Sequence, residues 1–214
     1  MKLLTLILII GLGLPTFMYQ KSCDDKPIFQ PDEHGVAYCT TKGTLFSRSA
    51  KVVGKNLDVE AKMTWTDAAD RAQVEVSVPL QSFKSGSKKR DKHVAEILGA
   101  PDFTSINFST EWLEAEMLCE SISQGSFALP GSLEVKGTRF PVIFDLQFSS
   151  VNARGIVKGL LETTFSDLNV TVPKVGPGGM IAKPHENLKL FVQLQLDSVH
   201  RADSLLQCIS TSAN

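Results

Sequence analysis

Apolar and polar residues alternate along most of the chain. From Leu57 to Trp65, every second residue is apolar, and the residues between them are charged or polar. A period of two places successive side chains on opposite faces of an extended strand, whereas a helix repeats every three to four residues. The pattern therefore predicts a strand with one buried face.

The same alternation recurs along the chain and predicts an all-β, antiparallel fold of about eight strands in a single domain. Lys88–Leu98 is the one short helix that we expect, because Gly99 ends it and Pro101 follows. A sandwich or a closed barrel would satisfy such strands, and an eight-stranded barrel is either filled by side chains or holds one small ligand. The expected strands are 44–53, 57–65, 74–80, 104–114, 127–135, 140–148, 155–165 and 188–196, with weaker support for 36–39.

The N-terminus is typical of an exported protein. Lys2 is followed by an apolar run from Leu3 to Tyr19 and then by polar residues, which is the pattern of a signal peptide. The exit from the run holds bulky residues, so an uncleaved anchor is the alternative. We predict a signal peptide or N-terminal anchor over residues 1–22, a linker over 23–35, a barrel domain over 36–198 and a C-terminal tail over 199–214, in a periplasmic or secreted protein.

Cysteine content and net charge indicate which covalent links and which partners to expect. Cys23, Cys39, Cys119 and Cys208 are four thiols in a chain predicted to be exported, so disulfides are expected, with three pairings open. The 22 basic and 23 acidic residues leave a net charge of −1. Without an excess of basic charge, we expect no nucleic-acid partner.

Motifs for catalysis or metal binding are missing from the sequence. The four histidines are far apart and show no close ligand spacing. No Gly-x-Ser-x-Gly elbow is present. We therefore expect a protein that is not an enzyme and that has no metal and no cofactor.

Several motifs in order resemble the YceI-like family of exported lipocalin-like barrels. They span roughly residues 43–197, and the resemblance rests on the ordered set of segments 80–86, 90–93, 103–108, 131–137, 141–142 and 166–170. The resemblance implies an antiparallel, eight-stranded lipocalin-like β-barrel whose elongated apolar cavity, in some members, holds a polyisoprenoid or a similar long-chain lipid.

On this basis the expected function is to hold a long-chain isoprenoid-type lipid for sequestration or transport, close to a membrane. The alternative is a cell-envelope structural or interaction protein with a filled barrel and no ligand. Arg90, Asp91 and His93 would hydrogen-bond a ligand head group or form a lid at the opening. Alternatively, Arg90 and Asp91 form an ion pair on the helix surface or fasten the helix to the barrel rim. The residues expected to point inward are Leu57, Val59, Met63, Trp65, Val76, Phe108, Phe144, Phe148, Leu190, Val192 and Leu194.

Overall fold

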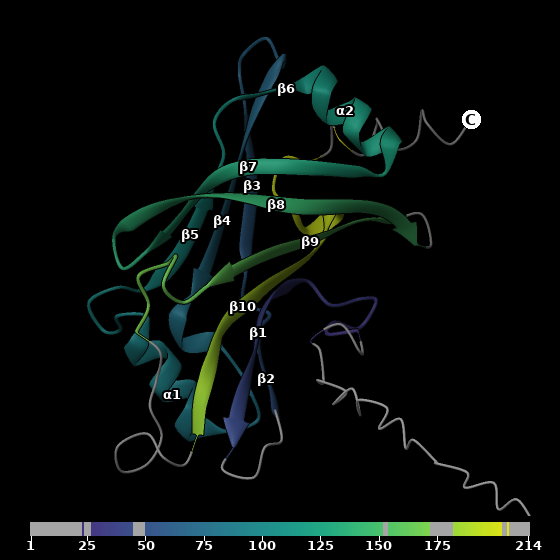
Figure 1. The fold of residues 1–214 in the computed structure, drawn as a ribbon. Coiled ribbons are helices and arrows are strands. Elements are labelled where there is room, and N and C mark those ends of the chain that lie inside the picture. The colour runs from purple at the N-terminus through teal and green to yellow at the C-terminus, as the bar shows by residue number, and fades with distance from the viewer. Residues whose placement is uncertain are drawn as a thin grey trace, which may run out of the picture.

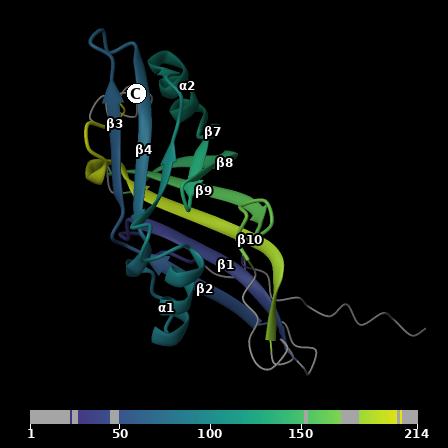
Figure 2. The same ribbon diagram turned by 90° about the vertical axis from the view of Figure 1, so that its left-hand side faces the viewer.

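One curled antiparallel sheet forms the body of the molecule (Figures 1 and 2). The computed structural model describes residues 23, 27–44, 50–151, 154–171, 182–202 and 205, and within them ten strands run in the order β2-β1-β10-β9-β8-β7-β5-β4-β3, with β6 beside β4. This confirms a single all-β domain. The strands are β1 (Gly35–Thr44), β2 (Ala50–Asn56), β3 (Glu60–Trp65), β4 (Arg71–Pro79), β5 (Ser105–Ser109), β6 (Leu113–Glu114), β7 (Ser126–Val135), β8 (Thr138–Val151), β9 (Arg154–Thr164) and β10 (Ala182–Gln195).

The predicted count of eight strands is corrected to ten for the described part of the chain. β1 is a full strand paired on both sides, by β2 and β10, although its Thr- and Lys-rich second half lacks apolar alternation. The expected strand over 104–114 is two strands, because Thr110 interrupts the ladder with β4. Its side chain accepts a hydrogen bond from the Val74 N–H (3.0 Å), and its own N–H donates to the Val74 carbonyl (3.0 Å).

Strand pairing does not close the sheet into a barrel. β2 and β3 are its edges, and within the described residues no ladder joins them. Other segments cover both edges. Lys84 exchanges two backbone hydrogen bonds with Lys55 of β2 (2.9 and 2.7 Å), and His200 bonds to Ala61 and Met63 of β3 (3.0 and 2.9 Å). Each contact occupies one position of its edge strand and so leaves fewer backbone groups free to pair with another chain. The expected closed eight-stranded barrel is therefore replaced by an open sheet with capped edges.

Two α-helices are described, at opposite ends of the sheet: α1 (Lys88–Ile97) and α2 (Ala115–Gln124) (Figures 1 and 2). α1 is the predicted helix. α2 corrects the expectation of a single helix: its Leu118 and Ile122 are one turn apart and buried, and Gly125 ends it at a φ of 77°, which favours glycine. Short 3-10 helices are η1 (Leu80–Ser82) and η3 (Leu196–Ser198). None of the described helices is long and apolar enough to cross a bilayer.

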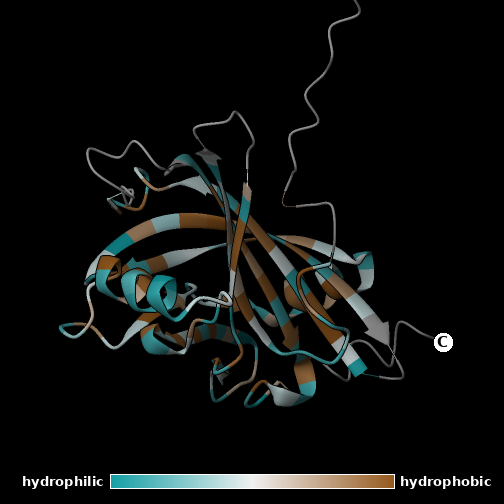
Figure 3. Cartoon of the chain, turned by 90° about the horizontal axis from the view of Figure 1, so that it is seen from below, coloured by the Kyte–Doolittle hydropathy of each residue, from teal (hydrophilic) through white to brown (hydrophobic). Residues whose placement is uncertain are grey.

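The core lies inside the curl of the sheet. Apolar positions alternate with polar ones along most of the strands (Figure 3). Phe108 of β5 and Phe144 of β8 meet edge to face, with ring centroids 5.4 Å apart. Gly131 of β7 makes this contact possible, because a Cβ there would lie 2.4 Å from the Phe108 ring. Aromatic and aliphatic side chains of the core cluster pack around these rings.

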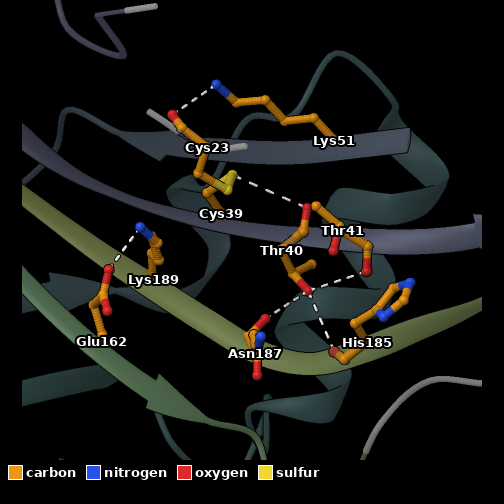
Figure 4. Close-up of a disulfide and its surroundings, with 9 residues drawn as sticks. All are labelled: Cys23, Cys39, Thr40, Thr41, Lys51, Glu162, His185, Asn187 and Lys189. Atoms are coloured by element: carbon orange, nitrogen blue, oxygen red, sulfur yellow. Dashed lines mark hydrogen bonds and ion pairs between the residues drawn. A yellow bond between two sulfur atoms is a disulfide. The ribbon is translucent and has the colours of Figure 1, made fainter. Parts of the chain in front are cut away.

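A disulfide between Cys23 and Cys39, with Cα atoms 6.2 Å apart, attaches the N-terminal part of the described chain to β1 (Figure 4). It is one of the pairings that the sequence left open. Lys51 of β2 adds a hydrogen bond to the Cys23 carbonyl (2.9 Å). Cys119 is also disulfide-bonded, whereas Cys208 lies outside the described residues. Both bonds indicate an oxidising compartment.

Residues 27–34, within the predicted linker, are held against β10. Gln193 donates to the carbonyls of Gln30 and Glu33 (2.7 and 2.8 Å). Lys55 of β2 also donates to the Glu33 carboxylate (2.7 Å), and this hydrogen bond holds the pKa of Glu33 below its ordinary value. The predicted signal or anchor at 1–22 lies outside the described residues, and the predicted tail is described only at 199–202 and 205.

Candidate ligand-binding site

A cavity of about 770 Å³ opens beside α1. Its walls come from α1, from β1, β2, β5, β7 and β10, and from the turn that follows β9. Its volume is within the range of roughly 300–1,000 Å³ that is usual for small-molecule sites. The lining residues are Tyr38, Thr40, Lys42, Val52, Phe83, Ser87, Lys89, Arg90, Lys92, His93, Val94, Glu96, Ile97, Leu98, Ile106, Leu133, Val135, Phe165, Leu168, Val170, Leu188 and Leu190.

The cavity exists because α1 covers this end of the sheet without filling it. Ala95 is the only residue of α1 that is fully buried, and its side chain is a single methyl group. The helix therefore lies over the opening, and its larger apolar residues, Val94 and Ile97, contribute to the cavity wall. Space enclosed in this way by hydrocarbon side chains suits an apolar ligand, since each buried methylene contributes about 0.8 kcal/mol.

Arg90 and Asp91 fasten α1 to the loop that follows η1. Arg90 Nε donates to the Ser85 hydroxyl (2.7 Å), and a second guanidinium nitrogen donates to the Ser85 carbonyl. Asp91 accepts from the Ser85 N–H (2.9 Å) and from the Ser85 hydroxyl. Because Lys84 is itself bonded to β2, this loop ties the helix to the sheet edge.

The three polar residues predicted at the opening are placed differently. Arg90 lines the cavity in addition to bonding Ser85, whereas Asp91 does not line it. His93 lines it from the helix surface, where its Nδ1 lies 3.6 Å from the Glu96 carboxylate. Asp91 therefore fastens the helix to this loop, and Arg90 does the same while also lining the cavity; contact with a ligand head group stays a prediction.

Tyr38 is the cavity residue that sequence reasoning missed and that changes the chemistry most. Its ring packs on Phe83 (centroids 5.7 Å apart) and over Gly54 of β2, where a Cβ would lie 2.3 Å from the ring. Its hydroxyl oxygen is buried and makes no hydrogen bond of good geometry among the described residues, but the Ser85 hydroxyl is near enough to lower its pKa. Burial raises the pKa of this hydroxyl, an effect that the positive charge of Arg90 opposes. The feature that could have identified it is the pairing of an aromatic residue, Tyr38, with a glycine, Gly54, on the neighbouring strand.

Most of the predicted inward residues do not line this cavity, and three of them, Val59, Val76 and Phe108, border a second hollow. Leu190 lines the cavity. Leu57 does not: its side chain is 48% exposed in the turn after β2, which Asn56 forms by accepting a hydrogen bond from the Asp58 N–H (2.9 Å). The indole N–H of Trp65 donates to the Arg201 carbonyl (2.8 Å). The residues of the set that pack within the core cluster are Val59, Met63, Trp65, Val76, Phe108, Phe144, Phe148, Val192 and Leu194.

A second, more polar hollow of about 760 Å³ lies over β3, β4, β5 and β7. Its polar groups satisfy one another. Lys62 pairs with Glu75 (3.1 Å), and Arg139 pairs with Glu134 (3.2 Å). The charged groups of this hollow are already paired, and its polar wall has little apolar surface for a lipid to bury. We do not assign a ligand to it.

No group of three or more His, Cys, Asp or Glu side chains that could hold a metal ion is found among the residues that the structure describes. The cavity wall carries hydroxyl, ammonium and guanidinium groups but a single carboxylate, Glu96. A wall of this composition can enclose a chain and contact a polar end group. Within the described part of the chain, the fold and the site together place a mainly apolar pocket beside α1.

The sequence matches the family model described as the YceI-like domain over residues 31–194, so the chain belongs to the YceI-like family. Comparison with curated proteins gives no match. Among solved structures, BcnA from Burkholderia cenocepacia is similar with a TM-score of 0.54 and 16% identity, covering 74% of this chain and 94% of that one. A polyisoprenoid binding domain from Saccharophagus degradans has a TM-score of 0.53 and 9% identity, covering 74% and 91%. At these identities the likeness establishes the fold.

Proposed function

We propose that this protein binds one long-chain, isoprenoid-type lipid in the cavity beside α1 and holds it for sequestration or transport. The observation that carries the proposal is the cavity itself, about 770 Å³ and walled mainly by Val, Leu, Ile and Phe side chains. A wall of this kind gains free energy from every methylene that it covers and discriminates poorly between chains of similar width. Family membership and the polyisoprenoid binding domain of similar fold support this ligand class.

Binding, rather than catalysis, is the function that this site supports. Acid–base or nucleophilic chemistry requires positioned groups around a reacting atom. The polar groups here come from α1 and its N-cap and from β1, and most of the other lining residues are hydrocarbon side chains. Two further proposals concern location. The disulfides and the N-terminal pattern favour an exported protein, periplasmic or secreted. A lipid ligand favours a location close to a membrane.

The test is native mass spectrometry of the purified protein, before and after organic extraction, followed by titration of the emptied protein with geranylgeraniol. We expect one equivalent of lipid per chain. Leu190→Trp places an indole in the cavity and should abolish uptake. Ile143→Trp adds the same bulk at a side chain that is 58% exposed, and it should bind like the wild type.

Two results of this experiment would contradict the proposal. If the wild type carries no lipid and takes up no geranylgeraniol, the lipid proposal falls, and the alternative of an envelope interaction protein without a ligand is favoured. If Leu190→Trp and Ile143→Trp retain the lipid equally, the lipid does not lie in this cavity.

A further inference from the structure

The two ends of the curled sheet differ in charge (Figures 1 and 2). At the α2 end, residues 66–71 and 110–124 contain six carboxylates and one arginine, and the Ala115 N–H joins the two segments by donating to the Asp70 carbonyl (2.8 Å). At the α1 end, residues 84–103 contain five cations and three carboxylates, and β1 and β2 add three lysines and no carboxylate. The net charge of −1 for the whole chain therefore leaves one end acidic and the other basic.

The lysines of the α1 end are exposed. Lys88, Lys89 and Lys92 lie in the first two turns of α1, Lys84 lies in the loop before it, and all four side chains are exposed. Lys92 is 3.9 Å from the Glu96 carboxylate. Among the described residues, no carboxylate lies at salt-bridge distance from the other three lysines. Their charge is therefore available to an anionic partner outside the molecule.

This basic surface borders the cavity. Lys89 and Lys92 belong to the cavity wall, whereas Lys84 and Lys88 lie outside it. A partner that contacted these lysines would therefore lie next to the cavity and far from α2. If that partner were a lipid bilayer, a long-chain lipid could pass between bilayer and cavity without exposing its whole chain to water.

An exposed aromatic ring lies at the same end of the molecule. Phe103 is 37% exposed, and its ring packs against the end of α1, since a Cβ at Gly99 would lie 2.7 Å from it. The α2 end also exposes apolar side chains, those of Trp112 (43%) and Met117 (37%). The surrounding charge distinguishes the two ends, because an anionic bilayer attracts the basic end and repels the acidic one.

We infer that the α1 end of this protein docks on the surface of an anionic lipid bilayer. Lys84, Lys88, Lys89 and Lys92 contact the lipid head groups, Phe103 enters the interface beside them, and the α2 end points away from the bilayer. Each lysine near an anionic bilayer strengthens binding by about fivefold, and the attraction falls off within a Debye length. The inference concerns an outer surface and does not depend on what the cavity holds.

Vesicle flotation of the full chain tests the charge dependence. Vesicles of phosphatidylcholine alone are compared with vesicles that also contain phosphatidylglycerol, at about 0.1 M and about 1 M salt, where the Debye length is about 10 Å and about 3 Å. We expect the anionic vesicles to bind about tenfold more tightly or better at the lower salt concentration, and the difference to vanish at the higher one. Equal affinity for both vesicle types at the lower salt concentration would overturn the inference.

Two double substitutions with the same change of net charge locate the effect. Lys84→Gln/Lys88→Gln removes two exposed lysines outside the cavity wall and should weaken binding to the anionic vesicles by about 25-fold. Arg154→Gln/Lys158→Gln removes two exposed cations of β9 and should leave that binding unchanged. Both variants should take up geranylgeraniol like the wild type, so loss of lipid uptake and loss of docking are separate results.

Fluorescence quenching by brominated phosphatidylcholine in the anionic vesicles measures the orientation. The exposed indole of the wild type is that of Trp112, at the α2 end. Phe103→Trp/Trp112→Phe transfers the exposed indole to the α1 end, and it should fold normally because both side chains are more than a third exposed. We expect the brominated lipid to quench the fluorescence of this variant and to leave that of the wild type unchanged.

Three further results would overturn the inference. Quenching of the wild type and not of the variant would place the α2 end on the bilayer. Equal weakening by the two double substitutions would assign the attraction to net charge instead of to the α1 end. Self-association at low salt in sedimentation velocity, without binding to either vesicle type, would show that the basic end pairs with the acidic end of a second copy of the chain.

Discussion

The two ends of the curled sheet carry the same alternating pattern and have different interiors. Along β10, Leu188 and Leu190 line the cavity on the α1 side, whereas Leu194 does not, although all three belong to the hydrophobic cluster or pack against it. Along β7, Leu133 lines the cavity and Leu129 does not, and both are members of the cluster. One strand therefore contributes both to the cavity wall and to the core away from it.

The helix at each end accounts for the difference. α2 inserts Leu118 and Ile122 into the packed cluster, and both are buried. α1 fully buries only Ala95. Strand alternation determines which face turns inward, whereas the side chains of the capping element determine whether the enclosed space is filled.

The hollow end is held together from the outer surface of its walls. The Cys23–Cys39 disulfide joins β1 to the preceding chain, and Lys189 of β10 pairs with Glu162 of β9 (2.6 Å) (Figure 4). Interior packing supplies less support here, because atoms facing a void lose their dispersion contacts. External fastening lets a wall keep its shape when the cavity is empty.

Paired truncations provide the strongest test of this comparison. Phe144→Ala removes a ring that is 6% exposed and contacts Phe108, so it should lower the free energy of unfolding by about 3–5 kcal/mol. Leu190→Ala borders existing space and should cost about 1–2 kcal/mol, below the usual range for a buried leucine. Urea denaturation of the lipid-free proteins measures both. Equal costs would mean that the two ends are packed alike.

Removing the N-terminal disulfide should have the next largest effect. The bond closes a loop with a sequence separation of 16, for which chain entropy gives about 3 kcal/mol. Cys23→Ala/Cys39→Ala should therefore unfold at correspondingly lower urea and bind lipid less tightly, because β1 carries Tyr38. The matched control is Lys51→Gln, which deletes only the hydrogen bond to the Cys23 carbonyl. An unchanged midpoint in the double variant would show that other contacts suffice to hold this wall.

Much of the fold could be predicted from the sequence because strand alternation is a local signal. Nearly every expected strand overlaps an observed one, and the helix expected over 88–98 is α1. The errors have local causes. Thr110 replaces part of a ladder with its side chain, and α2 is marked only by Leu118, Ile122 and Gly125, a single turn of periodicity followed by a cap.

The site was harder to predict, because alternation identifies an inward face and says nothing about what fills the space. Met63 and Phe144 were expected to line a cavity, and neither lines the one beside α1, although both belong to the hydrophobic core cluster. The lining depends on the small buried face of α1 and on Gly54, whose missing side chain leaves room for Tyr38. Both are contacts between segments distant in sequence, which a periodic pattern does not contain.

Lowering the pH should have a smaller effect on stability, and the effect should arise at the end that contains His34 and not at the cavity. His34 precedes β1, its Nδ1 accepts the Gln195 N–H (3.2 Å), and burial lowers its pKa although Asp197 opposes this. The unfolded chain, with a histidine pKa of about 6.5, therefore takes up a proton that the folded protein resists. The contribution of His34 to the free energy of unfolding is complete above about pH 6.5. It is lost as the pH falls below that value, by at most about 1.4 kcal/mol per pH unit.

Thermal unfolding between about pH 7.5 and 5.5 measures this slope. His34→Asn keeps an acceptor for the Gln195 N–H but cannot be protonated, so the part of the slope that belongs to His34 should disappear. Leu190→Trp changes the other end of β10 and should retain the wild-type slope, because the cavity contains none of the atoms that hold His34. If both variants flattened the curve equally, the two ends would not be independent, and filling the cavity would alter how the N-terminal segment docks on β10.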